Sequence, residues 1–307
     1  MEITVKKYIQ YLMIATLITL TTGCGDVPVS VDENTYEPKI VVDGIIMPGH
    51  RVENIRITRN FALNRDIDFT DFLITDATVG ITDLGSGDEY PLSYNALTGA
   101  YESDDDNLII EYGKQYQLSV QATVDGKNLS TTTVTTVPRD GFSIREADSK
   151  LTPLTYRERD ESGSLKLFTL AFDRSIDTDS YIASIVALDA SKESFVIDNP
   201  FEIEVEDLDE DNLFGLLQHQ SQWMQTQTGG DNLSKLEILW FTLWFYGRYR
   251  IILYAADENL KDYFLTHKNI QDIDGNLWEP KFHFEGDGIG VFGAALTDTV
   301  FVEVLKE

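Results

Sequence analysis

Cysteine is almost absent from this sequence, because Cys24 is the only one among 307 residues. A single thiol cannot form an intrachain disulfide, a cysteine-based zinc site or an iron–sulfur cluster. Histidine is nearly as rare, and the four histidines lie far apart without the spacing of a metal site. We therefore expect no metal held by these side chains, and no motif indicates any other cofactor.

Basic residues are also scarce. The chain has 24 Lys and Arg against 52 Asp and Glu, which gives a formal net charge of -28. Such a surface repels polyanions, so we expect no nucleic-acid partner. Hydrophobic residues make up 42% of the chain and aromatic residues 11%, which is too much for a disordered acidic tail. The composition therefore predicts a folded protein.

The apolar run nearest the N-terminus, from Tyr8 to Leu20, is too short to favour a membrane span, which needs about 20 residues. It follows Lys6 and Lys7 and precedes small residues, as in a bacterial secretion signal. The sequence Leu-Thr-Thr-Gly-Cys that ends at Cys24 resembles a lipobox, although its second residue is threonine instead of the usual leucine. We predict a signal peptide over residues 1–23 and a thioether-linked lipid with fatty acyl chains such as palmitate on Cys24. The alternatives are a transmembrane anchor and an incidental thiol.

The lipid on Cys24 would be the link to the membrane, and acyl chains gain about 0.8 kcal/mol for each buried CH₂ group. Residues 24–38 contain two prolines and several acidic residues, which predicts an extended tether.

The sequence pattern of residues 39–139 is typical of short β-strands. Apolar and polar residues alternate in several segments, and turn pairs such as Asp43-Gly44 and Asp125-Gly126 separate them. About seven short strands within 100 residues are typical of an immunoglobulin-like β-sandwich. We predict that fold here, without a cysteine pair.

Residues 140–307 are predicted to form a second β-rich domain with one or two short helices, so the fold class is mainly β. Its longer strands are expected at Leu165–Phe172, Ser180–Leu188 and Ile238–Tyr246. One helix is expected over Leu208–Gln225, and a shorter one is expected to be capped by Asp257.

The aromatic run near residue 240 is the first candidate site. On a strand, Trp240, Trp244 and Tyr246 would share one face and could bind a sugar or a peptide. The alternative is ordinary core packing, which we favour.

Two further patterns suggest chemistry only weakly. Gly288, Gly290 and Gly293 match the letters of a dinucleotide-binding motif, but only 14 residues follow them, so we interpret them as a bend that leads into a last strand. Three acidic clusters, at 104–106, 207–211 and 272–276, could hold calcium but lack a complete binding loop. Asp272, Asp274 and Asn276 form the best candidate for a weak calcium site, and solvated loops are the favoured alternative.

Several segments occur together in a characteristic order: the lipobox-like Cys24, Val41-Val-Asp-Gly-Ile45, Ala77-Thr-Val-Gly-Ile-Thr-Asp83, Gly113-Lys-Gln-Tyr-Gln-Leu-Ser119 and Gly288-Ile-Gly-Val-Phe-Gly-Ala294. In this order they resemble the DUF4249 family of Bacteroidetes outer-membrane lipoproteins, over nearly the whole chain after the signal. The resemblance implies a lipid-anchored outer-membrane location and a gene that is often encoded near TonB-dependent transporters. It implies no catalytic residues.

We therefore expect a non-catalytic outer-membrane lipoprotein that binds a partner protein or a nutrient ligand, beside a TonB-dependent transporter. Two other function classes stay open. A surface hydrolase of glycans or peptides is suggested only by the supply of carboxylates and the aromatic run, and an adhesin or structural surface protein is suggested by the sandwich-like first half.

Overall fold

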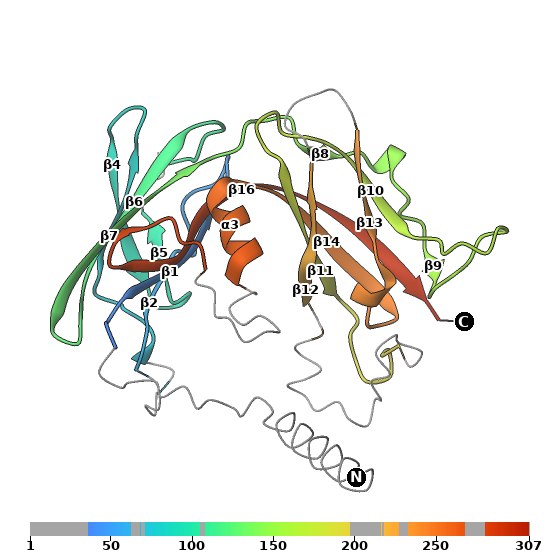
Figure 1. The fold of residues 1–307 in the computed structure, drawn as a ribbon, viewed down its shortest axis with the longest axis horizontal. Helices are drawn as coiled ribbons and strands as arrows, with labels where there is room; N and C mark the ends of the chain where they lie inside the picture. The colour runs from blue at the N-terminus through green and yellow to red at the C-terminus, as the bar shows by residue number, and fades with distance from the viewer. Residues whose placement is uncertain are drawn as a thin grey trace, which may run out of the picture. The chain divides into compact units, whose positions relative to one another are not determined.

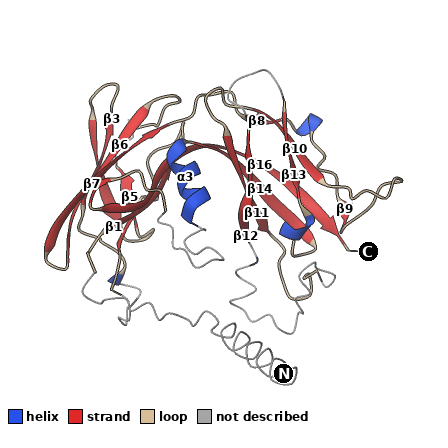
Figure 2. Cartoon of the chain, in the orientation of Figure 1, coloured by secondary structure: helices blue, strands red, loops and turns tan. Residues whose placement is uncertain are grey.

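The computed structural model describes residues 36–62, 68, 71–104, 108–196, 216, 218–226, 233–267 and 280–306. These residues are mainly β, which confirms the predicted fold class (Figures 1 and 2). The strands are β1 (Ile40–Ile46), β2 (Arg56–Arg59), β3 (Thr78–Asp83), β4 (Glu89–Asn95), β5 (Ala100–Ser103), β6 (Gln115–Val124), β7 (Lys127–Thr136), β8 (Ser143–Ile144), β9 (Leu154–Thr155), β10 (Phe168–Asp173), β11 (Ser180–Ala187), β12 (Gln218–Gln225), β13 (Ser234–Ile238), β14 (Gly247–Ala256), β15 (Glu285–Gly286) and β16 (Gly288–Leu305). The helical segments are α3 (Glu258–Thr266) and the 3₁₀ turns η3 (Glu146–Asp148) and η5 (Trp240–Thr242).

The strands form three sheets. A seven-stranded sheet has the order β12-β11-β14-β16-β1-β2, with β9 paired to the far end of β16. A six-stranded sheet has the order β15-β7-β6-β3-β4-β5, and a three-stranded sheet has the order β13-β10-β8. Most neighbouring strands are antiparallel, but β1 and β9 both run parallel to β16.

The longest hairpin forms where the sequence predicts a two-residue turn. β6 and β7 pair from Gln115 with Thr136 down to Val124 with Lys127, which leaves Asp125 and Gly126 as the connection. Both turn residues have positive φ, 49° and 75°. This is the backbone that a tight right-twisting hairpin requires and that the Asp-Gly pair accepts.

The first sandwich packs the six-stranded sheet against β1, β2 and the first half of β16. Alternate residues of each strand point inward, as the burial pattern of β1 illustrates, with Ile40, Val42, Gly44 and Ile46 buried. Its core contains Tyr101 and Tyr116 from one layer and Phe292 from the other, each at most 2% exposed.

The second sandwich packs the three-stranded sheet against β11, β14 and the second half of β16. Phe168, Leu170 and Phe172 of β10 meet Tyr181 of β11 and Tyr249 of β14 in this core. The rings of Phe172 and Tyr181 lie 4.7 Å apart between centroids. These four aromatic side chains are among the largest fully buried side chains of the described residues.

The strand β16 is shared by both sandwiches. Residues 288–294 pair with β1, and residues 295–304 pair with β14. The expected two domains, 39–139 and 140–307, follow the two sandwiches over most of the chain, but residues 285–294 complete the first one. The structure joins both sandwiches in a single compact unit of residues 38–60 and 66–307. The boundary at 139/140 stays a prediction.

The glycine-rich segment lies inside β16 and is not followed by a helix, so it does not have the form of a dinucleotide-binding loop. It is also not the bend that we expected. Gly290 has a φ of 103°, and a Cβ atom there would collide with the carbonyl oxygen of Val42. A Cβ atom on Gly288 would collide with Thr131 of β7. The glycines are needed because β16 passes very close to its neighbours.

The helix expected after Asp257 is confirmed. The Asp257 side chain accepts a hydrogen bond from the backbone N–H of Leu260 and caps α3. Leu260 is buried, and Tyr263 and Phe264 pack beside it against the seven-stranded sheet. The described residues contain no helix long and apolar enough to cross a bilayer.

Two predicted elements are wrong. Gln218–Gln225, expected to end a helix, is the strand β12 and pairs with β11. The apolar run Ile238–Tyr246 is not one strand, because β13 ends at Ile238 and η5 follows. The first segment is mostly polar, and its pairing with β11 overrides the local pattern. The second is an apolar run, which fits a buried helix, strand or turn equally well.

Candidate functional site

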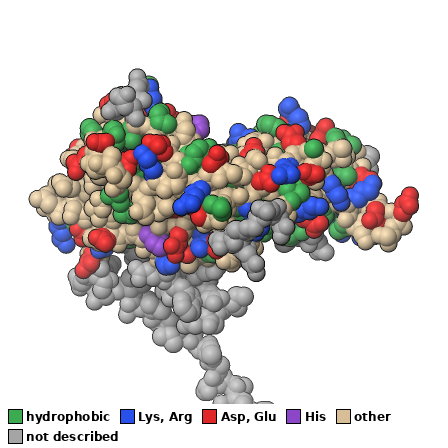
Figure 3. All heavy atoms as spheres, turned by 90° about the horizontal axis from the view of Figure 1, so that it is seen from above, with side chains coloured by type: hydrophobic (Ala, Val, Ile, Leu, Met, Phe, Trp, Pro, Cys, Tyr) green, Lys and Arg blue, Asp and Glu red, His purple; other side chains and the backbone are tan. Residues whose placement is uncertain are grey.

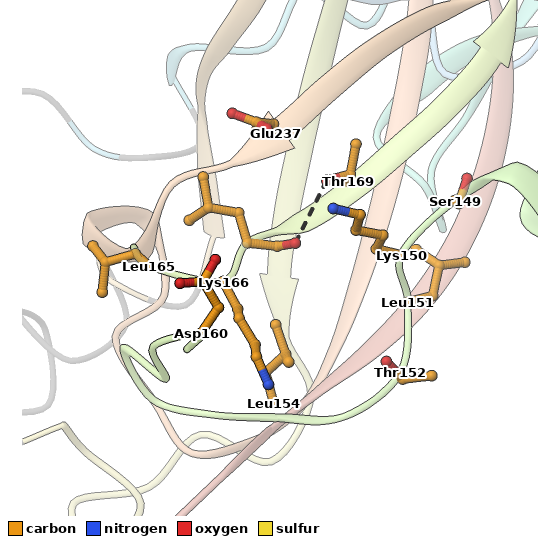
Figure 4. Close-up of a pocket in the computed structure, with 11 residues that line it drawn as sticks. Ser149, Lys150, Leu151, Thr152, Leu154, Asp160, Leu165, Lys166, Thr169 and Glu237 are labelled. Atoms are coloured by element: carbon orange, nitrogen blue, oxygen red, sulfur yellow. Dashed lines mark hydrogen bonds between the residues drawn. The ribbon is translucent and has the colours of Figure 1, made fainter. Parts of the chain in front are cut away.

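A groove with a volume of about 590 Å³ lies beside β10 in the described part of the chain. Three segments build it: the connection from η3 to β9, the turn that leads to β10, and β10 itself with its neighbour β13 (Figure 4). A volume of this size is typical of small-molecule sites. The lining residues are Ser149, Lys150, Leu151, Thr152, Leu154, Asp160, Leu165, Lys166, Leu167, Thr169 and Glu237.

Leucines give the groove its apolar part. Leu151, Leu154 and Leu167 are partly buried and pack against the second core, so their positions are fixed by that core. Leu165 is 39% exposed at the open side. The second core therefore holds the apolar part of the groove in a fixed position.

Lys150 gives the groove an available positive charge. Its backbone pairs with that of Thr169 in both directions, at 2.8 and 3.1 Å between nitrogen and oxygen. Its side chain extends across the groove towards Thr169 (Figure 4). Among the ion pairs between described residues, none involves the Lys150 ammonium group. This ammonium group can therefore bind an anionic group of a ligand.

The second lysine is already engaged. Lys166 forms an ion pair with Glu158, and this contact raises the pKa of Lys166. Figure 4 shows its side chain running along the groove beside Leu154. Lys166 thus contributes mainly its aliphatic stem to the lining.

A tight turn shapes one end of the groove. The carboxylate of Asp160 accepts hydrogen bonds from the Ser162 hydroxyl at 2.6 Å and from the backbone N–H groups of Ser162 and Ser164 at 2.9 and 3.0 Å. These bonds, led by that from the Ser162 hydroxyl, lower the pKa of Asp160. Asp160 is therefore a charged residue whose bonds organise the turn.

The three aromatic candidates do not form one exposed face. Trp240 is 6% exposed, and its indole Nε1 donates a hydrogen bond to the carbonyl of Lys166 at 2.9 Å. Trp244 stacks on Phe195, with ring centroids 6.2 Å apart. Tyr246 meets Tyr156 edge to face at 6.3 Å. Trp240 therefore packs in the core. Its hydrogen bond to the carbonyl of Lys166 holds the backbone of the groove in position.

The other predicted site residues lie outside the part of the chain that the structure describes. These are Cys24 and the calcium candidates Asp272, Asp274 and Asn276. Of the first acidic cluster only Asp104 is described, and it is exposed. Within the described ranges, no three His, Cys, Asp or Glu side chains are arranged to hold a metal ion.

A second, more polar cleft of about 480 Å³ lies at the N-terminus of α3. Asp177, Asp179 and Glu258 give it a negative character, and Lys261 lies 3.6 Å from Asp179. Its lining consists mainly of acidic and other polar side chains and contains no leucine, so the leucine-lined groove is the better site for a ligand with an apolar body. Over the face seen in Figure 3, acidic and basic side chains are interspersed.

The groove could not be predicted from the sequence. Its residues come from a connecting segment around residues 149–167, which contains several charged residues, together with Glu237 from a distant strand. The one local signal was the group of leucines at 151, 154, 165 and 167 within that segment.

The family model described as a domain of unknown function, DUF4249, matches residues 26–299. No curated protein matches the chain significantly. One similar solved structure carries the description "Structural insight into host cell surface retention of a 1.5-MDa bacterial ice-binding adhesin", with 10% sequence identity and a TM-score of 0.21. The alignment covers 88% of this chain and 65% of that chain, less than two thirds of its length. At this TM-score the similarity carries no argument about fold or function.

Proposed function

Because the chain belongs to the DUF4249 family, which is described only as a domain of unknown function, we propose a function from the chain's own residues. The protein is a non-catalytic, lipid-anchored protein of the outer membrane that binds a nutrient ligand or a partner protein. Cys24 carries the lipid, and a TonB-dependent transporter is the partner that receives the ligand. The signal-like segment before Cys24 supports the anchor.

The groove beside β10 is the observation that carries the binding function. It combines leucines fixed by the second core with the free ammonium group of Lys150. The matching ligand has an apolar body and one anionic group, such as a carboxylate. An apolar surface supplies the binding free energy, and one well-placed charge fixes the orientation.

Binding is tested on the full chain with a panel of apolar carboxylates and short peptides, by calorimetry. For a ligand that binds, Lys150→Glu should weaken affinity about tenfold or more, because a hydrogen-bonded charge pair is replaced by repulsion. Lys192→Glu makes the same charge change on an exposed lysine outside the groove and should leave the affinity within about twofold. Equal losses in both variants would reject the groove as the site.

The anchor is tested separately. Mass spectrometry of the natural protein should show an N-terminal Cys24 that carries acyl chains, and Cys24→Ala should move the chain out of the membrane fraction. A bare thiol on Cys24, or an intact leader, would contradict the anchor without affecting the groove.

The partnership with a transporter is tested by purification of the native lipoprotein from detergent-solubilised membranes after mild crosslinking. We expect a TonB-dependent transporter in stoichiometric amount. Its absence, with the lipoprotein recovered intact, would remove the transporter from the proposal.

A further inference from the structure

The outer face of β14 and β16 carries an exposed aromatic residue. One face of these strands fills the second core with residues such as Tyr249 and Val302, and alternate residues point to the opposite side. There Phe301 is 60% exposed and stands directly opposite Arg250 in the strand register. Leu188 and Leu305, 42% and 40% exposed, lie on the same face. Charged residues lie between these apolar side chains, with Glu303 between Phe301 and Leu305 on β16, and Arg248 and Arg250 on β14.

The charges on this face fall into two groups. The guanidinium of Arg248 is already paired, because it donates hydrogen bonds to both carboxylate oxygens of Asp189, at 2.9 and 2.8 Å. Arg250 and Glu303 are both exposed, and in the described part of the chain neither forms an ion pair. Glu303 stands opposite Arg248 in the strand register, and Arg250 stands opposite Phe301, so one positive and one negative side chain without an ion pair flank Phe301 among the described residues.

We propose that this face is the contact between two copies of the chain, related by a twofold axis that passes through Phe301. Arg250 lies one strand away from Phe301, about 4.8 Å, and Glu303 lies two residues along β16, about 6.8 Å. A twofold axis parallel to the sheet and just outside this face, along the diagonal between these two directions, exchanges them. It places Arg250 of each copy over Glu303 of the other.

This arrangement fits known packing geometry. The strands of the two copies cross at nearly a right angle, which is one of the two common ways in which sheets pack face to face. Phe301 of one copy meets Phe301 of the other on the axis, and Leu188 lies close to its own symmetry mate. Aromatic residues and arginine in the centre of a contact are typical of residues that dominate binding energy.

The charge of the chain makes this face a selective contact. A net charge of -28 repels two copies in most orientations. On this face, by contrast, Arg250 is balanced by Glu303 of the other copy, and Arg248, which lies near the axis and faces its own symmetry mate, is neutralised by Asp189 of the same copy. Salt screens the long-range repulsion over about 8 Å at physiological ionic strength, so association should strengthen with added salt until the local pairs are screened as well.

The test is a charge exchange followed by sedimentation velocity of the full chain in mild detergent. Arg250→Glu alone and Glu303→Arg alone each place like charges face to face, and each should lower the association constant about tenfold or more. The double variant carrying both changes restores opposite charges across the axis and should recover association to within about threefold of the original chain. Phe301→Ala should weaken association both in the original chain and in each of the charge variants.

Arg56→Glu is the matched control, since it makes the same charge change on the distant strand β2. Its association should match that of the original chain, and thermal unfolding of all variants should confirm that they are folded. A chain that stays monomeric at every concentration and salt level would overturn the proposal. So would a double variant as weak as the single ones.

Discussion

The hydroxyl of Thr135 donates a hydrogen bond to the buried carboxylate of Asp257 at 2.5 Å. Thr135 belongs to β7 of the first sandwich, and Asp257 follows β14 of the second and caps α3. Next to it, the side-chain amide of Asn259 donates to the carbonyls of Val134 and Phe292 at 2.8 and 2.9 Å. A buried polar network therefore fixes α3 between the two sandwiches.

Removing the Asp257 carboxylate should destabilise the protein. Asp257→Ala leaves the Thr135 hydroxyl and the Leu260 N–H without their acceptor, so we expect a loss of about 2 kcal/mol in the free energy of unfolding. Asp257→Asn keeps an acceptor oxygen and should lose less. Glu258→Ala, the exposed neighbour in the first turn, should change stability by less than about 0.5 kcal/mol. Urea denaturation measures all three, and equal losses for the two alanine variants would contradict a special role for Asp257.

Stability should depend on pH through the same carboxylate. Burial raises the pKa of Asp257 above its ordinary value, and hydrogen bonds from Thr135 and the backbone offset only part of this rise. A raised pKa in the folded state means that the protonated form is favoured by folding. Its contribution is complete below the ordinary carboxyl pKa and is lost as the pH rises through the raised value.

The measurement compares the original chain with Asp257→Asn, which cannot titrate at this position. The difference in unfolding free energy should shift in favour of the variant as the pH rises above the ordinary carboxyl pKa of about 4. The general repulsion among the acidic residues affects both proteins alike, so the comparison removes it. A difference that is constant with pH would show that the Asp257 pKa is not raised.

Gly290 should be intolerant of any side chain. Gly290→Ala combines a φ of 103° with a collision against the backbone of Val42 in β1, so we expect a loss of about 3 kcal/mol or more, or failure to fold. Gly87 is the matched control, because its φ is also positive, at 82°, but nothing lies within 4 Å of an added Cβ. Gly87→Ala should cost only about 1 kcal/mol. Similar unfolding midpoints for the two variants would contradict the close approach of β16 and β1.

Trp240 should behave as a core residue. Trp240→Ala should lower the unfolding free energy by about 3 to 5 kcal/mol, and Trp240→Phe should lose less because it keeps the ring contacts with Phe168 and Tyr156. Phe241→Ala, the adjacent residue with 44% exposure, is the control and should lose far less. If Trp240→Ala kept full stability but lost affinity for sugars or peptides, the ligand-platform interpretation would be correct instead.

The parts of the fold that depend on neighbouring residues could be predicted from the sequence. The Asp125-Gly126 turn follows from backbone preferences of two residues, and the Asp257 cap follows from a side chain that bonds a backbone group three positions away. Neither feature needs information from the rest of the chain.

The features that depend on distant partners could not be predicted. The apolar run after Ile238 is consistent with a strand, and only the packing of Trp240 against Tyr156 and Phe168 shows why it turns at η5 instead. The groove likewise brings Glu237 next to residues 149–169. Strand register and pairing between distant segments set these positions, and no local sequence pattern encodes them.

The shared strand β16 also has a consequence for synthesis. A nascent chain that has reached residue 287 has made eight of the strands of the first sandwich, but it still lacks Phe292 and Ala294 from that core. It lacks Val300 and Val302 from the second core as well. Neither sandwich can complete its core during elongation. Both therefore finish folding late, when β16 pairs with strands that are distant in the sequence.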